Sequence, residues 1–329
     1  MNWRSSPVDS PLGSIQPRIP VIGPRPGSDS FLGVAKAMNS AVDEFLASTG
    51  AVLLRGFGSL DTNQFGNLAR GIFRRLTRDN PEHNATESDA DVQTPVAYPA
   101  DQRLLWHNEN SFNARWPLRI MFGCEQRATS GGQTPLVDSR ALCDRLDPAL
   151  VRRFADHGVA YFRTYGSGVG LSWQKIFSTT SKGEVERQCR GNGVEFEWTD
   201  DGGLRTRAVR PAVIRHPLTG QRSWFNQAQH WHPACLDEQT REALLAVYGP
   251  GGLPRNCTLG DNSPIEDSIM HEILSCYQQI ETAFDWENGD VLVIDNVAMA
   301  HGRNPYTGSR RLLVAMGEEH SFADPRCRA

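Results

Sequence analysis

The chain has 329 residues and a formal net charge of −4. It is long enough to bury a sizeable core in one large domain or two small ones, and its charge gives no reason to expect a nucleic-acid partner. No apolar stretch approaches the length of a membrane span, and the N-terminus lacks the pattern of a signal peptide. Seven scattered cysteines without a Cys-x-x-Cys pair indicate reduced thiols in a cytoplasmic protein and argue against a disulfide scaffold.

The N-terminal residues 1–28 are rich in Pro, Ser and Gly, and this composition predicts an extended arm. Apolar residues at helical spacing from Phe31 to Ser48 predict the first helix. Asp29 or Ser30 can cap the start of this helix, and Gly50 can end it. A globular domain is therefore expected over residues 29–329.

Beyond the first helix, apolar runs predict short strands, and apolar residues at helical spacing predict further helices. The expected strands are 51–57, 118–126, 134–137, 159–164, a hairpin over 213–226, 291–294 and 310–316. The expected helices are 62–76 with Asp61 as its cap, 139–157, one near 182–189, 237–248 and 265–284. Two polar or glycine-rich stretches are expected to be a mobile loop or lid over 77–97 and an insertion around 166–206. Many short strands with helical decoration favour a mainly β fold, a double-stranded β-helix of the jelly-roll type.

The most informative segment is Trp106-His107-Asn108-Glu109-Asn110. In an extended backbone, residues i and i+2 point to the same face, so His107 and Glu109 offer an imidazole and a carboxylate together. A third ligand, His301, follows the predicted buried strand 291–294. Two histidines and one carboxylate cover one face of an octahedral metal and leave the other positions open, which is the ligand set of non-haem Fe(II) oxygenases. Alone, a His-x-Glu pair is a weak signal, and a surface loop is its ordinary interpretation.

The strand predicted over 310–316 begins with two arginines, Arg310 and Arg311. A histidine at one strand edge and an arginine on the returning strand suit a bound 2-oxo dicarboxylate. Its 2-oxo acid end would chelate the metal, and a guanidinium would form paired hydrogen bonds with its distal carboxylate. The alternative for both arginines is a solvated pair of charges at the strand edge.

These segments together resemble the taurine dioxygenase/TfdA family of Fe(II)- and 2-oxoglutarate-dependent oxygenases. The sequence around the His-x-Glu pair resembles the SyrP-like and clavaminate-synthase-like branches of that family more than the others. The matching stretches occur in the family's order and are Val52 to Phe57, Tyr98 to Phe112, Ser130 to Leu136, Trp224 to Asn226 and Gly289 to Met316. They cover most of the chain after residue 50, and together they form a specific signal.

The resemblance implies roles for further residues. Thr134 matches the threonine that helps to bind 2-oxoglutarate in the family. The place of the anchoring arginine of taurine dioxygenase corresponds here to Ala315, so the chain departs from the family at that point. Arg311 lies ten residues after His301 and shares strand parity with Ala315, whereas Arg310 faces the other side. We therefore expect Arg311 to anchor 2-oxoglutarate, with Arg310 as the rival.

The resemblance implies an enzyme that uses Fe(II), 2-oxoglutarate and O2 to hydroxylate a small molecule in specialised metabolism, such as antibiotic biosynthesis. The implied substrate is an amino acid, either free or tethered to a carrier protein. Halogenation is disfavoured because Glu109 is present, whereas iron halogenases have a small residue at that place. Two alternatives stay open: the same site could desaturate or close a ring, or the chain could be a non-catalytic jelly-roll binding protein. The intact ligand set argues against the second.

Several other residues are further candidates for the site. His230 and His232 form a second His-x-His pair, which we interpret as pocket wall or ordinary loop in preference to iron ligand. Trp106 and Phe112 flank the ligand pair and are expected to line the pocket. Three arginines could bind a substrate carboxylate, although surface pairing is the ordinary interpretation of each: Arg115, Arg119 and Arg303.

Overall fold

A computed structural model of the chain describes residues 5–7, 19–24, 31–77, 84–166, 168 and 170–329. The chain forms two compact units, each built from segments that are distant in sequence. The first unit takes residues 1–109, 117–140 and 280–320, and the second takes residues 110–116, 141–279 and 321–329. The predicted division into an arm over 1–28 and one domain over 29–329 stays a prediction.

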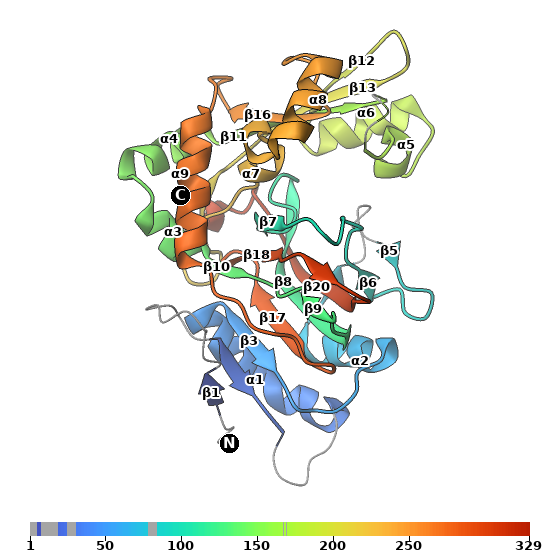
Figure 1. Ribbon diagram of the computed structural model, residues 1–329, viewed down its shortest axis with the longest axis vertical. Coiled ribbons are helices and arrows are strands. Elements are labelled where there is room, and N and C mark those ends of the chain that lie inside the picture. The colour runs from blue at the N-terminus through green and yellow to red at the C-terminus, as the bar shows by residue number, and fades with distance from the viewer. Residues whose placement is uncertain (1–4, 8–18, 25–30, 78–83, 167, 169) are drawn as a thin grey trace. The chain divides into compact units, whose positions relative to one another are not determined.

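The largest sheet lies in the first unit, apart from the first two residues of β8 and the last residue of β20, and it combines strands from both ends of the sequence (Figure 1). Its strands follow one another in the order β1 (Ser5–Pro7), β2 (Pro20–Ile22), β3 (Ala51–Leu54), β17 (Val291–Asp295), β8 (Arg115–Gln126), β20 (Arg311–Ser321), β6 (Gln93–Thr94) and β5 (Asn84–Ala85). A short strand, β4 (Leu76–Thr77), pairs with β20. Strand β17 pairs antiparallel with both β3 and β8, and all of its residues are buried. The buried strand predicted over 291–294 is therefore confirmed.

The two faces of this sheet pack against different apolar clusters, because side chains alternate along a strand. On one face, Val291 and Val293 pack with helices α1 (Phe31–Thr49) and α2 (Thr62–Ile72). On the other face, Leu292 and Ile294 belong to a second cluster. Complete burial of one such side chain stabilises the folded state by about 1.5–3 kcal/mol. The four residues of β17 therefore stabilise the packing on both faces of the sheet.

A three-stranded antiparallel sheet in the first unit carries the segments that the sequence marked as ligand-bearing. Its strands lie in the order β10 (Leu136–Asp138), β18 (Met299–Arg303) and β7 (Leu104–His107). Leu136 and Met299 belong to the same apolar cluster as Leu292 of β17, so this sheet shares a core with the largest sheet. A short strand just before β10 pairs with a short strand just after β18; these are β9 (Ser130–Gly131) and β19 (Tyr306–Thr307).

The second unit has its own four-stranded sheet and a hairpin. The sheet has the order β12 (Glu195–Trp198), β13 (Leu204–Arg210), β11 (Val159–Tyr165) and β16 (Arg255–Leu259), and β14 (Val213–Arg215) pairs with β15 (Arg222–Trp224). The helices of this part are α4 (Pro148–His157), α5 (Trp173–Ile176), α6 (Lys182–Gly191), α7 (Ala228–Trp231), α8 (Glu238–Tyr248) and α9 (Asp267–Ile280), with 3-10 turns at Pro233–Cys235 and Pro325–Cys327. Helices and strands hold similar numbers of the described residues, so the fold is mixed α/β, and the prediction of a mainly β chain is wrong in its proportions.

Several predicted elements are confirmed, and one is wrong. Helix α2 begins after Asp61, whose side chain accepts a hydrogen bond from the backbone N–H of Gln64, as a capping residue does. The single helix predicted over 139–157 is two helices, α3 (Ser139–Arg145) and α4. Asp147 caps the start of α4, and Pro148 occupies its first turn, where the missing N–H is tolerated.

Three other predictions are modified by the structure. Residues 20–22 of the expected arm form β2, which joins the largest sheet beside β3, while the expected caps Asp29 and Ser30 lie outside the described residues. The expected loop over 77–97 contains β5 and β6, and its residues 78–83 also lie outside the described part. The expected insertion 166–206 supplies β12 and the start of β13, so it extends the sheet of the second unit.

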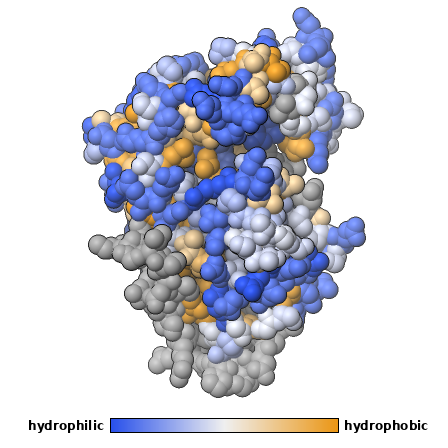
Figure 2. Space-filling model, viewed as in Figure 1, coloured by the Kyte–Doolittle hydropathy of each residue, from blue (hydrophilic) through white to orange (hydrophobic). Residues whose placement is uncertain are grey.

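The surface is mostly polar on the face drawn in Figure 2, where hydrophobic residues form smaller patches between hydrophilic ones. None of the helices in the described part of the chain is long and apolar enough to cross a membrane.

Candidate functional site

The pairing of β7 with β18 brings together two histidines that are far apart in the sequence. His107 and His301 are direct cross-strand partners, and the centroids of their rings lie 4.3 Å apart. On its other side, His301 is the register partner of Leu136 in β10. The central strand of the small sheet therefore fixes His301 between two neighbours, and its side chain is buried.

A β-bulge sets the direction of His301. The register between β18 and β7 shifts after this pair, since Arg303 is opposite Leu104. Gly302 lies at the shift, and a Cβ atom on it would be 2.7 Å from the carbonyl oxygen of Leu104. Its N–H donates to the carbonyl of Pro135 at 3.0 Å. Glycine is needed here because the backbones approach too closely for any side chain, and bulges of this kind commonly aim a residue at a site.

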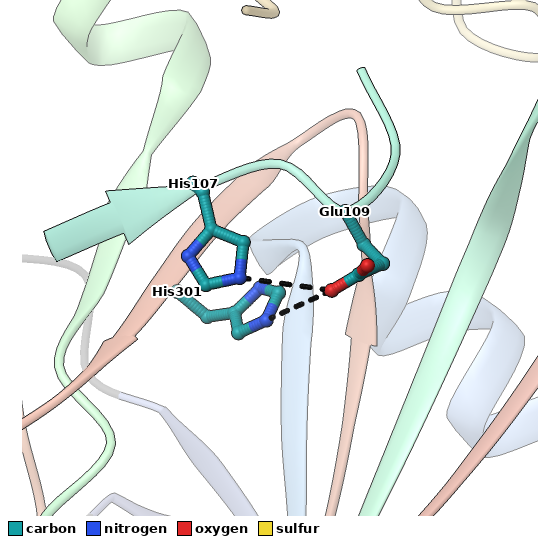
Figure 3. A group of neighbouring side chains, drawn as sticks. All are labelled: His107, Glu109 and His301. Atoms are coloured by element: carbon teal, nitrogen blue, oxygen red, sulfur yellow. Dashed lines mark ion pairs between the residues drawn. The ribbon is translucent and has the colours of Figure 1, made fainter. Parts of the chain in front are cut away.

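Glu109 lies two residues beyond the end of β7 and completes the group (Figure 3). One carboxylate oxygen, Oε2, is 3.6 Å from Nε2 of His107 and 4.0 Å from Nε2 of His301. One ligand atom from each of the three residues lies within 4.8 Å of the others. The predicted convergence of His107, Glu109 and His301 is confirmed.

The donor set fits a divalent iron. His107 donates from Nδ1 to the carbonyl oxygen of Leu105 at 3.0 Å, which leaves the lone pair of Nε2 for a metal and holds the ring in one orientation. Both Nε2 atoms and the carboxylate face the same space, which is the arrangement that holds non-haem iron while leaving positions open for other ligands. The Phe122 ring packs 5.1 Å from the ring of His301 and contributes an apolar wall.

Comparison with known proteins identifies the family. The family model described as taurine catabolism dioxygenase TauD, TfdA family matches residues 26–316. The chain belongs to the TauD/TfdA dioxygenase family. It is similar to the dapdiamide synthesis protein DdaC of Enterobacter agglomerans, with 36% identity over 276 residues that cover 84% of each protein. It is also similar to a clavaminate synthase-like protein of Arabidopsis thaliana, with 28% identity over 96% of this chain and 95% of the other.

Solved structures support the fold. The chain is similar to PvcB of Pseudomonas aeruginosa, with a TM-score of 0.57 and 16% identity over 95% of this chain and 90% of that one. A taurine dioxygenase from Burkholderia xenovorans gives a TM-score of 0.54 and 15% identity, covering 96% of this chain and 89% of that one. As a TauD/TfdA member, the protein is an Fe(II)- and 2-oxoglutarate-dependent dioxygenase, and its metal ligands are His107, Glu109 and His301. The alternative of a non-catalytic binding protein therefore loses its support.

Thr134 lies close to the metal ligands of this TauD/TfdA enzyme. It comes two residues before Leu136, the register partner of His301, and it is 3% exposed. Its hydroxyl oxygen accepts a hydrogen bond from Nε1 of Trp286 at 3.1 Å. A hydroxyl that accepts from an indole keeps its own proton to donate, which suits an anionic neighbour. The sequence interpretation missed Trp286, because nothing in one sequence pairs it with Thr134.

The two arginines lie opposite to their predicted orientations. Arg311 is the exposed one, and its guanidinium pairs with the carboxylate of Glu125. Arg310 is partly buried, and its Nε donates to the carbonyl oxygen of Gly132 at 3.2 Å. Its guanidinium carbon lies 5.5 Å from the centroid of the Tyr306 ring. The exposure of the two arginines is thus the reverse of the predicted one, while the choice of the arginine that binds 2-oxoglutarate stays a prediction.

The packing of β20 explains this reversal. Leu312 and Val314 belong to the apolar cluster that includes Phe122, the neighbour of His301. Leu313 and Ala315 belong to the opposite cluster, which packs with α1 and α2. Even-numbered residues of this strand thus face the metal ligands, so Arg310 has the parity of the site. Ala315 therefore faces the helices and not the metal ligands.

Burial also lowers the pKa of Arg310. Loss of water around the guanidinium, followed by the nearby positive charge of Arg303, lowers the pKa of Arg310 to about 10. Within the described residues, no carboxylate forms an ion pair with Arg310. A partly desolvated cation of this kind is stabilised by a bound anion.

The remaining candidates have other roles or lie in the second unit. Arg303 donates to the carbonyl oxygens of Tyr98 at 3.1 Å and Gln102 at 2.6 Å, so it holds the segment that leads into β7. Arg119 pairs with Asp43 of α1 at 2.7 Å. In the second unit, both ring nitrogens of His232 bond to backbone groups, which removes it as a metal ligand. Arg115, Phe112 and His230 also belong to the second unit, and their predicted roles stay predictions.

Proposed function

We propose that this enzyme hydroxylates an amino acid or an amino-acid-derived substrate in specialised metabolism. The observation that carries the proposal is the three-ligand centre of His107, Glu109 and His301, in which the carboxylate is retained. The similarity to DdaC, whose name places it in dapdiamide synthesis, and to a clavaminate synthase-like protein supports an amino-acid-derived substrate. A cytoplasmic location also stays a prediction.

The co-substrate 2-oxoglutarate would be held by residues beside the triad, on a jelly-roll core. Arg310 would pair with its distal carboxylate, because this guanidinium has the parity of the site and its nearest acceptor is a single backbone carbonyl. Thr134 would donate its hydroxyl proton to the same anion, since Trp286 already occupies an acceptor position of that oxygen.

The positions of these residues suggest a separate role for the metal, for its ligands and for the apolar residues around them. When bound, iron supplies the activation of O2 that breaks an unactivated C–H bond. His107, Glu109 and His301 would hold this metal, and a set of three protein ligands would leave room for 2-oxoglutarate and O2. Phe122 and the apolar cluster behind it exclude water from the protein side of the centre.

The experiment that tests this proposal is incubation of the holoenzyme with Fe(II), 2-oxoglutarate and a panel of amino acids, with succinate as the readout. Each active substrate is then compared free and loaded on a carrier protein. A product heavier by one oxygen atom supports hydroxylation, whereas loss of two hydrogens supports desaturation or ring formation by the same centre. Succinate formation that no amino acid or aminoacyl carrier stimulates would overturn the assigned substrate class. The His301→Ala variant is the control for turnover at the triad.

A further inference from the structure

A fully buried amide side chain lies next to the carboxylate ligand in the loop between β17 and β18. Asn296 is 0% exposed and follows Asp295, the last residue of β17. The side chain of Asp295 accepts hydrogen bonds from the N–H groups of Val297 and Ala298, each at 2.9 Å, so the turn around Asn296 is fixed on one side. A buried amide is retained only where its donors and acceptors are satisfied.

The side chain of Asn296 binds the backbone of Glu109 at two points. Its Oδ1 accepts from the N–H of Glu109 at 2.6 Å, and its Nδ2 donates to the carbonyl oxygen of Glu109 at 3.0 Å. β7 ends at His107, so Glu109 lies beyond the strand that aligns the first histidine. One amide side chain therefore gives residue 109 the two bonds that a neighbouring strand would give.

Further bonds hold Asn296 itself. Its Nδ2 also donates to the carbonyl of Pro117 at 2.8 Å, and its backbone N–H donates to the carbonyl of Leu118 at 2.8 Å. Its carbonyl oxygen accepts from Nδ2 of Asn108 at 2.7 Å, and the same Asn108 amide reaches the hydroxyl of Ser139 at 3.1 Å. The residue before the carboxylate ligand and the ligand itself are thus both bound to Asn296, which is bound in turn to β8.

We propose that Asn296 is a positioning residue that holds Glu109 in its metal-binding place before the metal arrives. It touches neither metal nor substrate, and it acts through the backbone of the ligand. The proposal rests on His107, Glu109 and His301 being the metal site. An amide is required because Asp would lose both donated bonds and Leu would lose all three side-chain bonds.

The main test compares the metal affinity of folded variants. Asn296→Ala should bind Co(II), used as a probe for Fe(II), about 10–100-fold more weakly than the wild type, and the d–d absorption of bound Co(II) should change with the ligand geometry. Asn226→Ala is the matched control, because Asn226 is also 0% exposed and bonds two backbone groups, but in the second unit. The control should lose thermal stability and keep wild-type Co(II) affinity. Wild-type affinity in Asn296→Ala would overturn the proposal.

A second measurement uses the wild-type protein alone and does not depend on whether the variant folds. Hydrogen exchange of the Glu109 amide should be slow in the metal-free protein, because Asn296 already accepts its hydrogen. Fast exchange that becomes slow only when Co(II) is added would show that the metal positions the loop, and the proposal would be wrong. If His301→Ala binds Co(II) as the wild type does, the assignment of the triad has failed, which is a different outcome.

Discussion

The surroundings of the Arg310 guanidinium favour the binding of an anion. Its guanidinium lies between the Tyr306 ring and the carbonyl of Gly132, and burial lowers its pKa to about 10. The charge is therefore retained at neutral pH, although its environment disfavours it. A carboxylate that accepts two hydrogen bonds from the guanidinium would replace the water that burial removes. This is the role we assign to the distal carboxylate of 2-oxoglutarate.

The first prediction compares neighbouring arginines. Arg310→Gln should weaken 2-oxoglutarate binding by about 2–5 kcal/mol, as the loss of a buried charged contact does, and should raise its KM far more than that of the prime substrate. Arg311→Gln is the control, because its side chain pairs with Glu125 at an exposed position, and its effect should be small. Steady-state kinetics with each substrate varied would measure both. A large effect in Arg311→Gln with none in Arg310→Gln would reverse our assignment.

The second prediction concerns the indole that orients Thr134. Trp286→Phe keeps most of the ring and removes the N–H that bonds to Thr134, so the hydroxyl can turn away from the co-substrate. The KM for 2-oxoglutarate should rise by an amount equivalent to about 0.5–1.5 kcal/mol, less than in Arg310→Gln. Thr134→Val should show a similar rise. In the double variant the two effects should not add, and full additivity would mean that the two residues act independently.

The identities of the residues at the metal were predictable from the sequence, whereas the exposure of the two adjacent arginines was not. The alternation of an extended backbone was enough to place His107 and Glu109 on one face. The strand that follows the arginines is buried on both faces from Leu312 to Met316, so its hydrophobic pattern does not say which parity faces the site. The role of Asn296 was not predictable, because its bonds to Glu109 join segments distant in sequence.

At the scale of elements, the antiparallel pairing of β7 with β18 places His107 beside His301. Both segments were recognisable in the sequence, but the bulge at Gly302 was not, since a register shift depends on the partner strand. The predicted helix over 139–157 failed for a local reason. Asp147 and Pro148 are typical of a helix start, so a new helix begins here. Apolar residues recur at helical spacing on both sides of this point, and the two helices were therefore predicted as one.

The third prediction tests the bulge. In Gly302→Ala the new methyl would meet the carbonyl oxygen of Leu104 at 2.7 Å, so β18 and β7 must separate. We expect a loss of about 1–3 kcal/mol in the free energy of unfolding and weaker metal binding. Gly251→Ala is the control, because a Cβ there has no neighbour within 4 Å. Urea unfolding and Co(II) titration measure the two effects, and unchanged values in Gly302→Ala would contradict the close approach.

The fourth prediction concerns the helix layer behind the largest sheet. Asp61 caps α2, and the side chain of Gln64 accepts a hydrogen bond from the backbone N–H of Asp61. Asp61→Ala should lower the free energy of unfolding by about 0.5–2 kcal/mol. Metal affinity should not change in the folded protein, because α2 packs on the face of the sheet away from the ligands. An altered Co(II) spectrum would show that the layer does affect the centre.

At the scale of the molecule, the metal site is a product of folding. All three ligands lie in the first unit, but they come from two segments that are far apart in the sequence. The site therefore exists only when β7 and β18 pair, and any metal that binds it stabilises the folded chain.

The fifth prediction follows from this linkage. Metal at about 100 times its Kd should add about 2.7 kcal/mol to the free energy of unfolding and raise the Tm of the wild type. His107→Ala, Glu109→Ala and His301→Ala should each lose turnover and most of this rise. Arg311→Gln should keep it. Anaerobic melting with and without Co(II) is the measurement, and a full rise in any one ligand variant would remove that residue from the site.

The way in which Glu109 is held has an evolutionary consequence. Asn296 binds its main-chain N–H and C=O, so neither bond depends on the carboxylate that reaches the metal. The loop can therefore keep its shape while the side chain at position 109 is exchanged. A scaffold of this kind separates the architecture of a metal centre from its coordination chemistry. New reactivity that needs a shorter ligand, or a vacant coordination position, then lies a single substitution away without rebuilding the fold.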